Sequence, residues 1–550
     1  MAIAKDIPSI WTTGWTDVLN TGTWRSAIPE HRRRLAPCQN QCPVDGEIPV
    51  WVQQVKNEKY LEAWQTLVEN NPFPAVSGRI CHHPCEQACN RGEYDEAVTV
   101  NALEQFVGDI ALQEGWALPE PISSVNKRVA VIGGGPAGLS CAYQLRRQGL
   151  AVTVFEMNEE LGGVMRYGIP EYRLPKSVLR AEISRLLALG IETVTKQKVS
   201  GAELDSLTKE YDAVFLAIGA SESKTLPQFA AVNGKVLAGL DFLGQVTRGE
   251  NPRLGREVAV IGGGSVAMDV ARSARRHGSR VTVLALENRE NLPAQIDEIR
   301  EAIGEGISIL AGSMVQTCRS GDKLVLDCVK VELDQQAPVG ILQPVVMPEA
   351  GFSLQVDQVI LAVGQDPDME NWREQLRTEK SLVAVNSGLA TSRSRVFAGG
   401  DVITRQRYFS TAVGQGKQAA QAMMAEWGLL ESATKDQRDI VPFSDINTFY
   451  FPATTRVEKG LIPFGMRAES FNEVKTGFTG SQAHAQAERC FSCGNCLECD
   501  NCFYFCPDMA VVKDSSLPEH YRVLTQYCKG CGCCVEECPR GAVVLKEEER

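Results

Sequence analysis

Nineteen cysteines carry the clearest chemistry in this chain. Near the C-terminus the pattern C-x2-C-x2-C-x3-C-P occurs twice. Cysteines at this spacing are typical iron–sulfur ligands, and where two such runs occur the fourth cysteine of each run binds the cluster of the other. We therefore expect two [4Fe-4S] clusters, one on Cys496, Cys499, Cys502 and Cys538 and one on Cys528, Cys531, Cys534 and Cys506.

A second group lies near the N-terminus and consists of Cys38, Cys42, Cys81, Cys85 and Cys89. Disulfide frameworks belong mainly to small domains of oxidising compartments, which we do not expect for 550 residues without a signal-peptide pattern. Zinc is the alternative, but its sites favour paired C-x2-C spacings, and thiolates suit iron–sulfur clusters. For these N-terminal cysteines, cluster or metal ligation is therefore favoured. Cys533, in the C-terminal group, falls outside the two repeats and is not expected to be a ligand.

Between the cysteine groups the chain carries a nucleotide-binding pattern. A buried-strand pattern at residues 129–132 leads into G-x-G-x-x-G, which turns from strand to helix around a pyrophosphate. The predicted contacts here are Gly133, Gly135, Pro136, Ala137 and Gly138. A second strand, at 152–155, ends at Glu156, which can accept hydrogen bonds from a ribose. Their order predicts a dinucleotide site, with an ordinary glycine-rich turn as the alternative.

A second unit of the same kind begins at Glu257. Its fingerprint, G-x-G-x-x-A, offers the contacts Gly262, Gly264, Ser265 and Ala267, and its second strand is expected at residues 281–284. A second unit inserted within the first domain is the arrangement of flavoproteins that bind FAD and a nicotinamide nucleotide. No C-x2-C or C-x4-C pair follows the first unit, and Cys141 is expected to be core packing.

Motifs after the first fingerprint carry a family resemblance. Glu160-Leu161-Gly162-Gly163, Tyr167-Gly168-Ile169-Pro170 and Arg173-Leu174-Pro175-Lys176 resemble the FAD-binding half of the glutamate synthase small subunit family. That family includes the large subunit of NADH-dependent ferredoxin:NADP oxidoreductase and the N-terminal part of dihydropyrimidine dehydrogenase. The resemblance spans about residues 37–421. It implies FAD contacts at Gly163, Tyr167, Asp401 and Ala412, the last two beside the flavin at the end of the VFAGGD strand and the start of the following helix.

The coenzyme prediction rests on the end of the second unit's second strand. NADPH-using relatives carry Tyr-Arg-Arg there, whereas this chain has Ala285, Leu286 and Glu287. A carboxylate accepts hydrogen bonds from a bare ribose diol but repels a 2′-phosphate, by about 4 kcal/mol per charge pair at about 4 Å and an effective dielectric near 20. We therefore predict NAD(H), with Glu287 at the ribose and Arg289 as the residue that could rescue phosphate binding.

The family also implies which residues hold the N-terminal clusters. One cluster would use Cys42, Cys81, Cys85 and the carboxylate of Glu104. Relatives complete the other with a C-x2-C pair upstream of Cys38, which this chain lacks. Residues 470–493 look like the stretch that carries that pair in relatives, so we hypothesise that Cys490 and Cys493 join Cys38 and Cys89. The alternative is one cluster from the five local cysteines. Three or four clusters are expected in all.

These motifs predict an α/β protein with five parts. They are a helical iron–sulfur domain (1–120), an FAD-binding Rossmann-like domain (126–243 and 366–430), an inserted NAD-binding domain (244–365), a linker or docking segment (431–485) and an α+β ferredoxin-like domain (486–550). The net charge of −12 disfavours nucleic acid as a partner. No run of 18 apolar residues is present, so we expect a cytoplasmic protein without a membrane span.

The combined motifs predict an electron-transfer subunit linking NAD(H) to an iron–sulfur partner in a hetero-oligomeric complex. The segment YCKGCGCCVEECPRGAVV resembles the small ferredoxin subunit of 2-oxoacid oxidoreductases, which favours such an enzyme as partner. The alternatives are a stand-alone NADH:ferredoxin oxidoreductase, a donor to a dissimilatory sulfite reductase, and a structural module. Because the cofactors would perform the redox chemistry, no catalytic acid–base residue is expected.

Overall fold

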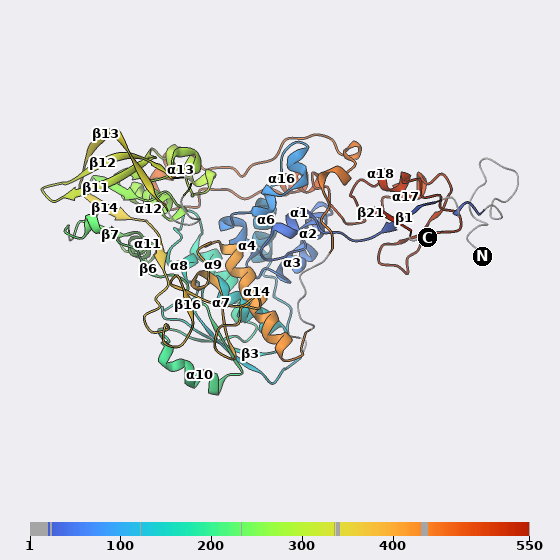
Figure 1. Cartoon of the computed structure of the whole chain (residues 1–550), viewed down its shortest axis with the longest axis horizontal. Coiled ribbons are helices and arrows are strands. Elements are labelled where there is room, and N and C mark those ends of the chain that lie inside the picture. The colour runs from blue at the N-terminus through green and yellow to red at the C-terminus, as the bar shows by residue number, and fades with distance from the viewer. Residues whose placement is uncertain are drawn as a thin grey trace.

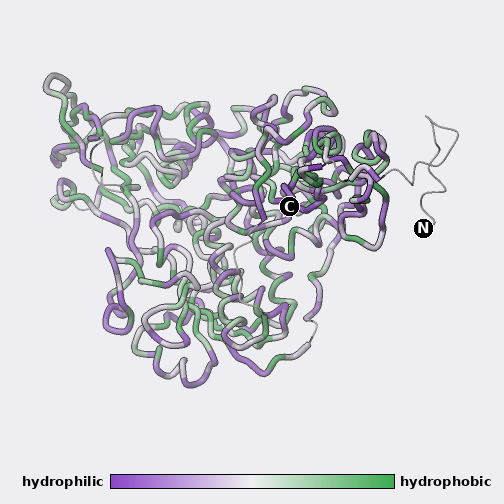
Figure 2. Tube along the Cα trace, turned by 45° about the vertical axis from the view of Figure 1, so that its right-hand side comes forward, coloured by the Kyte–Doolittle hydropathy of each residue, from purple (hydrophilic) through white to green (hydrophobic). Residues whose placement is uncertain are grey.

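The computed structural model describes residues 20–22, 25–121, 123–232, 234–334, 336, 342–430 and 438–548. Residues 1–19 of the predicted first domain lie outside this part. In Figure 1 a helical domain (residues 37–113) lies centrally, with one sheet-containing unit below it, a second to its left and a small C-terminal domain to its right. Figure 2 shows hydrophobic and hydrophilic residues interspersed along much of the trace, as expected for elements with one buried face. Within the described ranges, no helix is both long and apolar enough to cross a membrane.

The first dinucleotide unit is a parallel sheet in the order β18-β5-β2-β3-β4. Its strands are β2 (Arg128–Ile132), β3 (Ala151–Phe155), β4 (Glu192–Val194), β5 (Ala213–Leu216) and β18 (Val396–Ala398). Its helices are α7 (Pro136–Arg147), α8 (Val164–Tyr167), α9 (Lys176–Leu187), α10 (Leu204–Glu210) and α14 (Phe409–Glu426). Two small ribbons pair β6 (Glu222–Ser223) with β15 (Gln365–Asp366) and β16 (Thr378–Glu379) with β17 (Leu382–Val383). β5 is buried throughout, as expected for a strand made of apolar residues. α14 packs closely along α7, because both helices contain many small residues.

The second dinucleotide unit has the same parallel plan, in the order β10-β9-β8-β14-β7. Its strands are β7 (Val236–Ala238), β8 (Glu257–Ile261), β9 (Arg280–Leu284), β10 (Ser308–Leu310) and β14 (Gln358–Leu361), and its helices are α11 (Gly239–Thr247), α12 (Ser265–Arg276) and α13 (Ile296–Gly304). An antiparallel meander adds β11 (Ser313–Arg319), β12 (Leu324–Leu333) and β13 (Pro344–Val356). β7 pairs with β14, so the predicted boundary at residue 244 lies too late: pairing with a strand 120 residues away leaves no local signal.

The N-terminal helical domain contains α1 (Pro37–Gln41), α2 (Ile48–Lys56), α3 (Tyr60–Val68), α4 (Pro74–Ile80), α5 (Pro84–Gln87) and α6 (Val100–Gln113). Trp51 and Trp64 are buried in its core. α2 and α3 are separate helices, because the chain turns between them and Glu58 adopts a left-handed conformation with φ of 57°. Burial of both tryptophans therefore comes from packing two short helices side by side.

The C-terminal domain includes a strand from the other end of the chain. β1 (Ala27–His31) pairs antiparallel with β21 (Val543–Glu547), beside β19 (Val511–Lys513), β20 (Tyr521–Val523), α17 (Asn501–Tyr504) and α18 (Cys533–Glu536). The predicted domain 1–120 therefore divides, since residues 27–31 belong to the sheet of the C-terminal domain. Figure 1 shows β1 and β21 together at the right of the molecule.

The described part of the predicted linker, residues 438–485, is packed over the rest of the chain. We call residues 452–479 the strap; it contains α15 (Phe464–Glu469) and leads into α16 (Gly480–Glu488), which packs on α2 and α6. Arg456 of the strap pairs with Glu86 at 2.6 Å. Lys475 pairs with Asp297 at 3.0 Å in the second unit. The strap therefore joins the helical domain to the second unit through charged contacts that composition alone could not reveal.

Two adjacent residues fix the second unit to the first. The guanidinium of Arg173 pairs with both Asp269 on α12 and Glu298 on α13, each at 2.5 Å. The buried ring of Tyr172 lies 3.9 Å from the guanidinium of Arg276. Arg276 in turn pairs at 2.6 Å with Glu305. Because these side chains are largely shielded from water, their pairing contributes more to the orientation of the two units than exposed ion pairs would.

Replacing Glu305 by glutamine should test this packing. Glu305 also binds Arg272, and all three side chains are at most 1% exposed. The variant therefore leaves the buried guanidinium of Arg276 without this countercharge, whereas Arg272 keeps Glu301 at 2.8 Å. We expect a loss of about 3 kcal/mol of unfolding free energy, measured by urea denaturation. Glu250→Gln, in an exposed pair with Arg248, is the control and should cost under about 1 kcal/mol. Equal costs would contradict the assignment.

Candidate functional site

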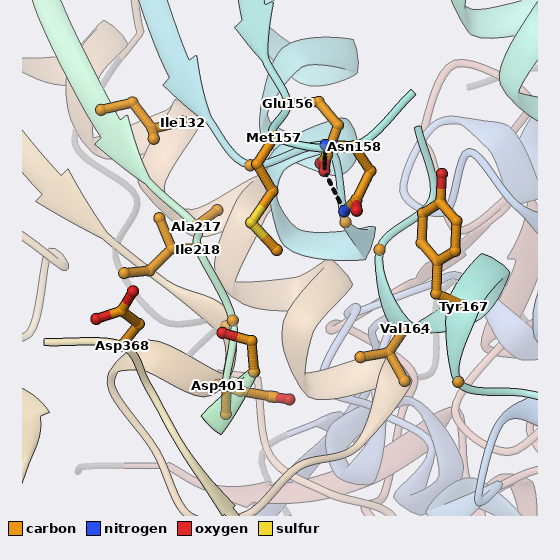
Figure 3. Close-up of a pocket in the computed structure, with 18 of the residues that line it drawn as sticks. Ile132, Glu156, Met157, Asn158, Val164, Tyr167, Ala217, Ile218, Asp368 and Asp401 are labelled. Carbon is orange, nitrogen blue, oxygen red and sulfur yellow. Dashed lines mark hydrogen bonds between the residues drawn. The ribbon is translucent and has the colours of Figure 1, made fainter. Parts of the chain in front are cut away.

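A cavity of about 550 Å³ opens where the strands of the first unit end. Ile132 and Phe155, the last residues of β2 and β3, and Ala217, the residue after β5, all line it. Ile132 and Ala217 are labelled in Figure 3. This edge of a parallel sheet is where doubly wound folds bind nucleotides. Nine predicted contacts line the cavity, namely Gly133, Gly135, Pro136, Ala137, Glu156, Gly163, Tyr167, Asp401 and Ala412. The cavity is therefore where the sequence places FAD.

Gly138 does not line the cavity but shapes its phosphate-binding turn. A side chain on Gly138 would collide with the carbonyl oxygen of Gly133 and lie 3.1 Å from the side chain of Val131. Gly133 itself has a φ of 108°, which L side chains rarely adopt. Helix α7 begins at Pro136, directly after this turn, so its free N–H groups face the cavity. The fingerprint glycines thus bring the helix close enough to the strand for a pyrophosphate to reach both.

The carboxylate of Glu156 is held rigidly at one end of the cavity. Its Oε2 accepts a hydrogen bond from the backbone N–H of Gly134 at 2.9 Å. Its Oε1 accepts bonds from the backbone and side-chain nitrogens of Asn158, at 2.9 and 2.7 Å (Figure 3). Sequence reasoning missed Asn158, although its position two residues after the acid is a usable signal. Oε2 can still accept one further bond from a ribose, since each carboxylate oxygen has two acceptor positions.

Asp401 and Asp368 carry two further carboxylates into the cavity (Figure 3). Burial raises the pKa of Asp401, and Arg407 opposes that shift. Asp368 was not predicted, because it lies on the loop that returns from the second unit and belongs to no recognised motif. The two acids make this part of the cavity suited to hydroxyl groups, which donate hydrogen bonds to carboxylates.

The second unit repeats the placement of the acid. A side-chain carbon on Gly134 would lie 3.2 Å from Oε2 of Glu156, and one on Gly263 would lie 2.9 Å from Oε2 of Glu287. The two carboxylates therefore occupy corresponding places beside the two fingerprint loops. Burial raises the pKa of Glu287. The fingerprint loop also resembles the first one: Gly262 has a φ of 133°. Helix α12 begins at Ser265, directly after Gly264, and Ala267 is fully buried.

The first turn of α14 separates the nucleotide cavity from a small cavity lined by thiols. Ala412 lines the nucleotide cavity, and Ser410, two residues earlier on α14, lines the second. The predicted ligands that meet there are Cys42, Cys81, Cys85 and Glu104. Two sites of different chemistry are thus separated by less than one helical turn of the same helix.

Glu104 sits among polar partners at this thiol cavity. It accepts hydrogen bonds from Asn71 Nδ2 at 2.8 Å and from Ser77 Oγ at 2.9 Å. Burial raises its pKa to about 7, opposed by these two donors. The backbone N–H of His83 donates to Cys81 Sγ at 3.3 Å. Asn71 and Ser77 orient the carboxylate, and no spacing in the sequence points to them.

The eight C-terminal repeat cysteines also meet in two groups. Cys496, Cys499, Cys502 and Cys538 line one small cavity. In the other group burial raises the pKa of Cys534 to about 12, with further contributions from Cys506, Cys528 and Cys531. Both sets combine three cysteines of one run with the fourth of the other, as the spacing predicts. Backbone N–H groups of Ala510, Gly530 and Ala542 donate to the sulfurs of Cys506, Cys528 and Cys538 at 3.2, 3.4 and 3.4 Å.

The remaining four predicted ligands, Cys38, Cys89, Cys490 and Cys493, converge as well. Over the described ranges, no three His, Cys, Asp or Glu side chains are placed to bind a single metal ion. Two of the four groups line small cavities, and sulfurs of all four groups accept N–H bonds, an arrangement suited to clusters whose irons are bridged by inorganic sulfide. Cys141 is fully buried and packs in the core of the first unit.

Comparison with known proteins decides the family. Residues 127–422 match the model of the pyridine nucleotide-disulphide oxidoreductases, which covers more than half of the chain. The chain belongs to this family. Residues 16–116 match dihydropyrimidine dehydrogenase domain II, 4Fe-4S cluster. This oxidoreductase therefore combines a flavoprotein fold with an iron–sulfur domain, as its resemblance to the glutamate synthase small subunits implied.

Three curated relatives are similar over most of the oxidoreductase. The NADP(+)-dependent formate dehydrogenase subunit beta of Moorella thermoacetica is 33% identical over 83% of this chain and 70% of its own. The NAD-dependent dihydropyrimidine dehydrogenase subunit PreT homolog of Salmonella typhi is 31% identical over 75% of this chain and 95% of its own. The glutamate synthase [NADPH] small chain of Escherichia coli K12 is 30% identical over 70% and 88%.

Substituting Gly138 by alanine should abolish flavin binding, because the added carbon cannot fit against the carbonyl of Gly133. We expect the purified variant to lose most of its FAD, measured from the absorbance of flavin released on denaturation. Gly304→Ala, at the end of α13 with no atom within 4 Å of the added carbon, is the matched control and should keep its FAD. Full FAD content in the Gly138 variant would refute the role given to this turn.

Proposed function

We propose that this oxidoreductase passes electrons between NAD(H) and an iron–sulfur partner, through FAD in the large cavity and through its own [4Fe-4S] clusters. The observation that carries the proposal is the position of α14, whose first turn lies between the nucleotide cavity at Ala412 and the thiol cavity at Ser410. When bound, FAD would supply two-electron hydride chemistry toward NAD(H) and one-electron chemistry toward the clusters. The protein's part is to hold these groups close together and shielded from water.

Specific residues would hold each group. The turn at Gly133–Gly138 and the start of α7 suit the FAD pyrophosphate, and Glu156 suits the adenosine ribose. Asp401 lies across the cavity, where it can accept a hydrogen bond from a ribityl hydroxyl (Figure 3). The N-terminus of α14 presents its positive dipole end to the cavity at Ala412. Such a dipole favours negative charge on a reduced flavin.

The coenzyme we propose is NAD(H). Glu287 lies beside its fingerprint loop as Glu156 lies beside the first, so a ribose hydroxyl would meet a carboxylate in both units. A 2′-phosphate at this position would face the same negative charge. Relatives are named after both coenzymes, NADP(+) and NADPH in two of those described above and NAD in the third. Family membership therefore does not distinguish NAD(H) from NADP(H), and the proposal for NAD(H) rests on Glu287.

Kinetics with both nucleotides test the coenzyme. The wild-type protein should have the higher kcat/KM with NADH in a dye-reduction assay. Glu287→Ala should lower kcat/KM for NADH by about 10- to 100-fold, because it removes hydrogen bonds between the ribose and a charged group. The same variant should not lower kcat/KM for NADPH. Glu290→Ala, three residues on in the same loop, is the control and should leave the ratio unchanged. A wild-type preference for NADPH would exclude this assignment.

Electrons would leave or enter at the C-terminal domain. Cys499 and Cys531, one from each predicted cluster of that domain, are exposed, whereas the described N-terminal cysteines are at least partly buried. We favour a 2-oxoacid oxidoreductase as partner, because of the resemblance of residues 527–544 to the ferredoxin subunit of such enzymes. A free ferredoxin, for a stand-alone NADH:ferredoxin oxidoreductase, and a dissimilatory sulfite reductase are the alternatives.

The proposed electron path is tested by anaerobic reduction. Adding NADH to the purified protein should bleach the flavin and then produce the EPR signals of reduced clusters. Purification from native extract, followed by assays with a 2-oxoacid plus coenzyme A, with sulfite and with free ferredoxin, separates the three partner classes. A preparation without flavin or acid-labile sulfide, or one in which NADH reduces neither, would overturn the proposal.

A further inference from the structure

Four cysteines that belong to opposite ends of the chain meet between the helical and C-terminal domains. Cys38 follows the start of α1 and Cys89 follows α5, whereas Cys490 and Cys493 lie just after α16. The side-chain nitrogen of Asn90 donates to Cys493 Sγ at 3.5 Å. Cys38 and Cys493 pack in the same apolar cluster, with Phe491. This meeting joins segments separated by about four hundred residues.

Backbone contacts hold the two segments in register. The N–H of Arg34 donates to the carbonyl of Gly494 at 3.0 Å. The buried guanidinium of Arg91 donates to the carbonyl of Arg489 at 3.0 Å and to the carboxylate of Asp95. Because these contacts flank Cys490 and Cys493 on both sides, the position of the two thiols relative to the helical domain is fixed by the fold.

The surroundings of the four sulfurs are those of metal ligands. Cys38, Cys89 and Cys490 all pack against the core that includes the helical domain, and Cys493 lies with Cys38 in the neighbouring apolar cluster. All four cysteines are free thiols. The backbone N–H of Ser492 donates to Cys490 Sγ at 3.3 Å, a bond that favours the thiolate. Buried thiolates this close together repel each other unless a cation lies between them.

The local alternative, one cluster from the five N-terminal cysteines, fits these positions less well. Cys42, Cys81 and Cys85 share a cavity with Glu104, and neither Cys38 nor Cys89 lines it. Cys38 lies in the first turn of α1 and Cys42 at its extended C-cap, whereas Cys85 lies on α5 and Cys89 two residues past the end of that helix. Each segment thus offers cysteines to two different sites.

We propose that Cys38, Cys89, Cys490 and Cys493 bind one [4Fe-4S] cluster that is assembled from both ends of the chain. This inference rests on the proposed function for its cluster chemistry. The site lies between the other groups: α1, which carries Cys38, packs against α5, which carries Cys85 of the thiol cavity. On the other side, the guanidinium of Arg540 lies near Cys490 and Cys493 and near Cys499 and Cys538 of the C-terminal domain.

The composite site therefore has two consequences. It provides the step that connects the cluster beside the flavin to the clusters of the C-terminal domain. It also links the two domains through iron, in addition to the hydrogen bond that Arg91 Nη1 donates to the carbonyl of Arg489 at 3.0 Å. Losing the cluster should then loosen the C-terminal domain as well as interrupt the path.

Cysteine replacement tests the composite site in the full-length holoprotein. Cys490→Ser with Cys493→Ser, and separately Cys38→Ser with Cys89→Ser, should each lose about four iron and four sulfide per chain and the same EPR signal, while retaining FAD. The quadruple variant should lose no more than either pair, because all four residues serve one cluster. Cys533→Ser, in the same domain but outside the repeats, is the matched control and should lose none.

Cys490→Asp guards against misfolding of the serine variants, since a carboxylate can replace a thiolate ligand. It should alter the EPR signal of a single cluster. Full iron content in the Cys490/Cys493 double variant, or an unchanged spectrum in Cys490→Asp, would overturn the composite site. If the composite site fails this test, the wild-type protein shows whether the proposed function fails with it. Wild-type protein that contains FAD, sulfide and NADH-reducible clusters would support the proposed function without the composite site. Wild-type protein that lacks them would overturn both the composite site and the proposed function.

Discussion

The cost of burying charge is the constraint on which most of this structure depends. A carboxylate, guanidinium or thiolate removed from water raises the free energy of the fold unless an opposite charge or several hydrogen-bond donors compensate it. Glu156 has three donors, Glu104 has two, and Arg173 has two carboxylates. The grouped thiols follow the same logic, with backbone N–H groups directed at several sulfurs.

This constraint also explains how the separate units are held together. Arg173 carries a buried charge from the first unit into the second, and the half-buried Lys475 of the strap pairs with Asp297 and Glu301 of the second unit. Such contacts are directional, so they define an orientation where apolar packing alone would tolerate sliding. The second unit is consequently attached on two sides, by the loop after α8 and by the strap that crosses over from the helical domain.

Much of the site could be predicted from the sequence, because its signals are local. The two glycine fingerprints, the acids after the second strands and the cysteine spacings each lie within a short segment, and the structure brings the predicted cavity contacts and thiol groups together. What sequence reasoning missed depends on contacts between distant segments. The pairing of β7 with β14 and the polar partners Asn71 and Asp368 leave no periodic or compositional trace.

The pairing of β1 with β21 has a consequence for biosynthesis. A nascent chain carries residues 27–31 out of the ribosome long before residues 543–547 are translated, so this edge of the C-terminal sheet cannot close during most of synthesis. Until then β1 remains without its partner strand, and unpaired strand edges are prone to aggregation. Completion of this domain is thereby deferred until residues 543–547 have been translated, more than five hundred residues after β1.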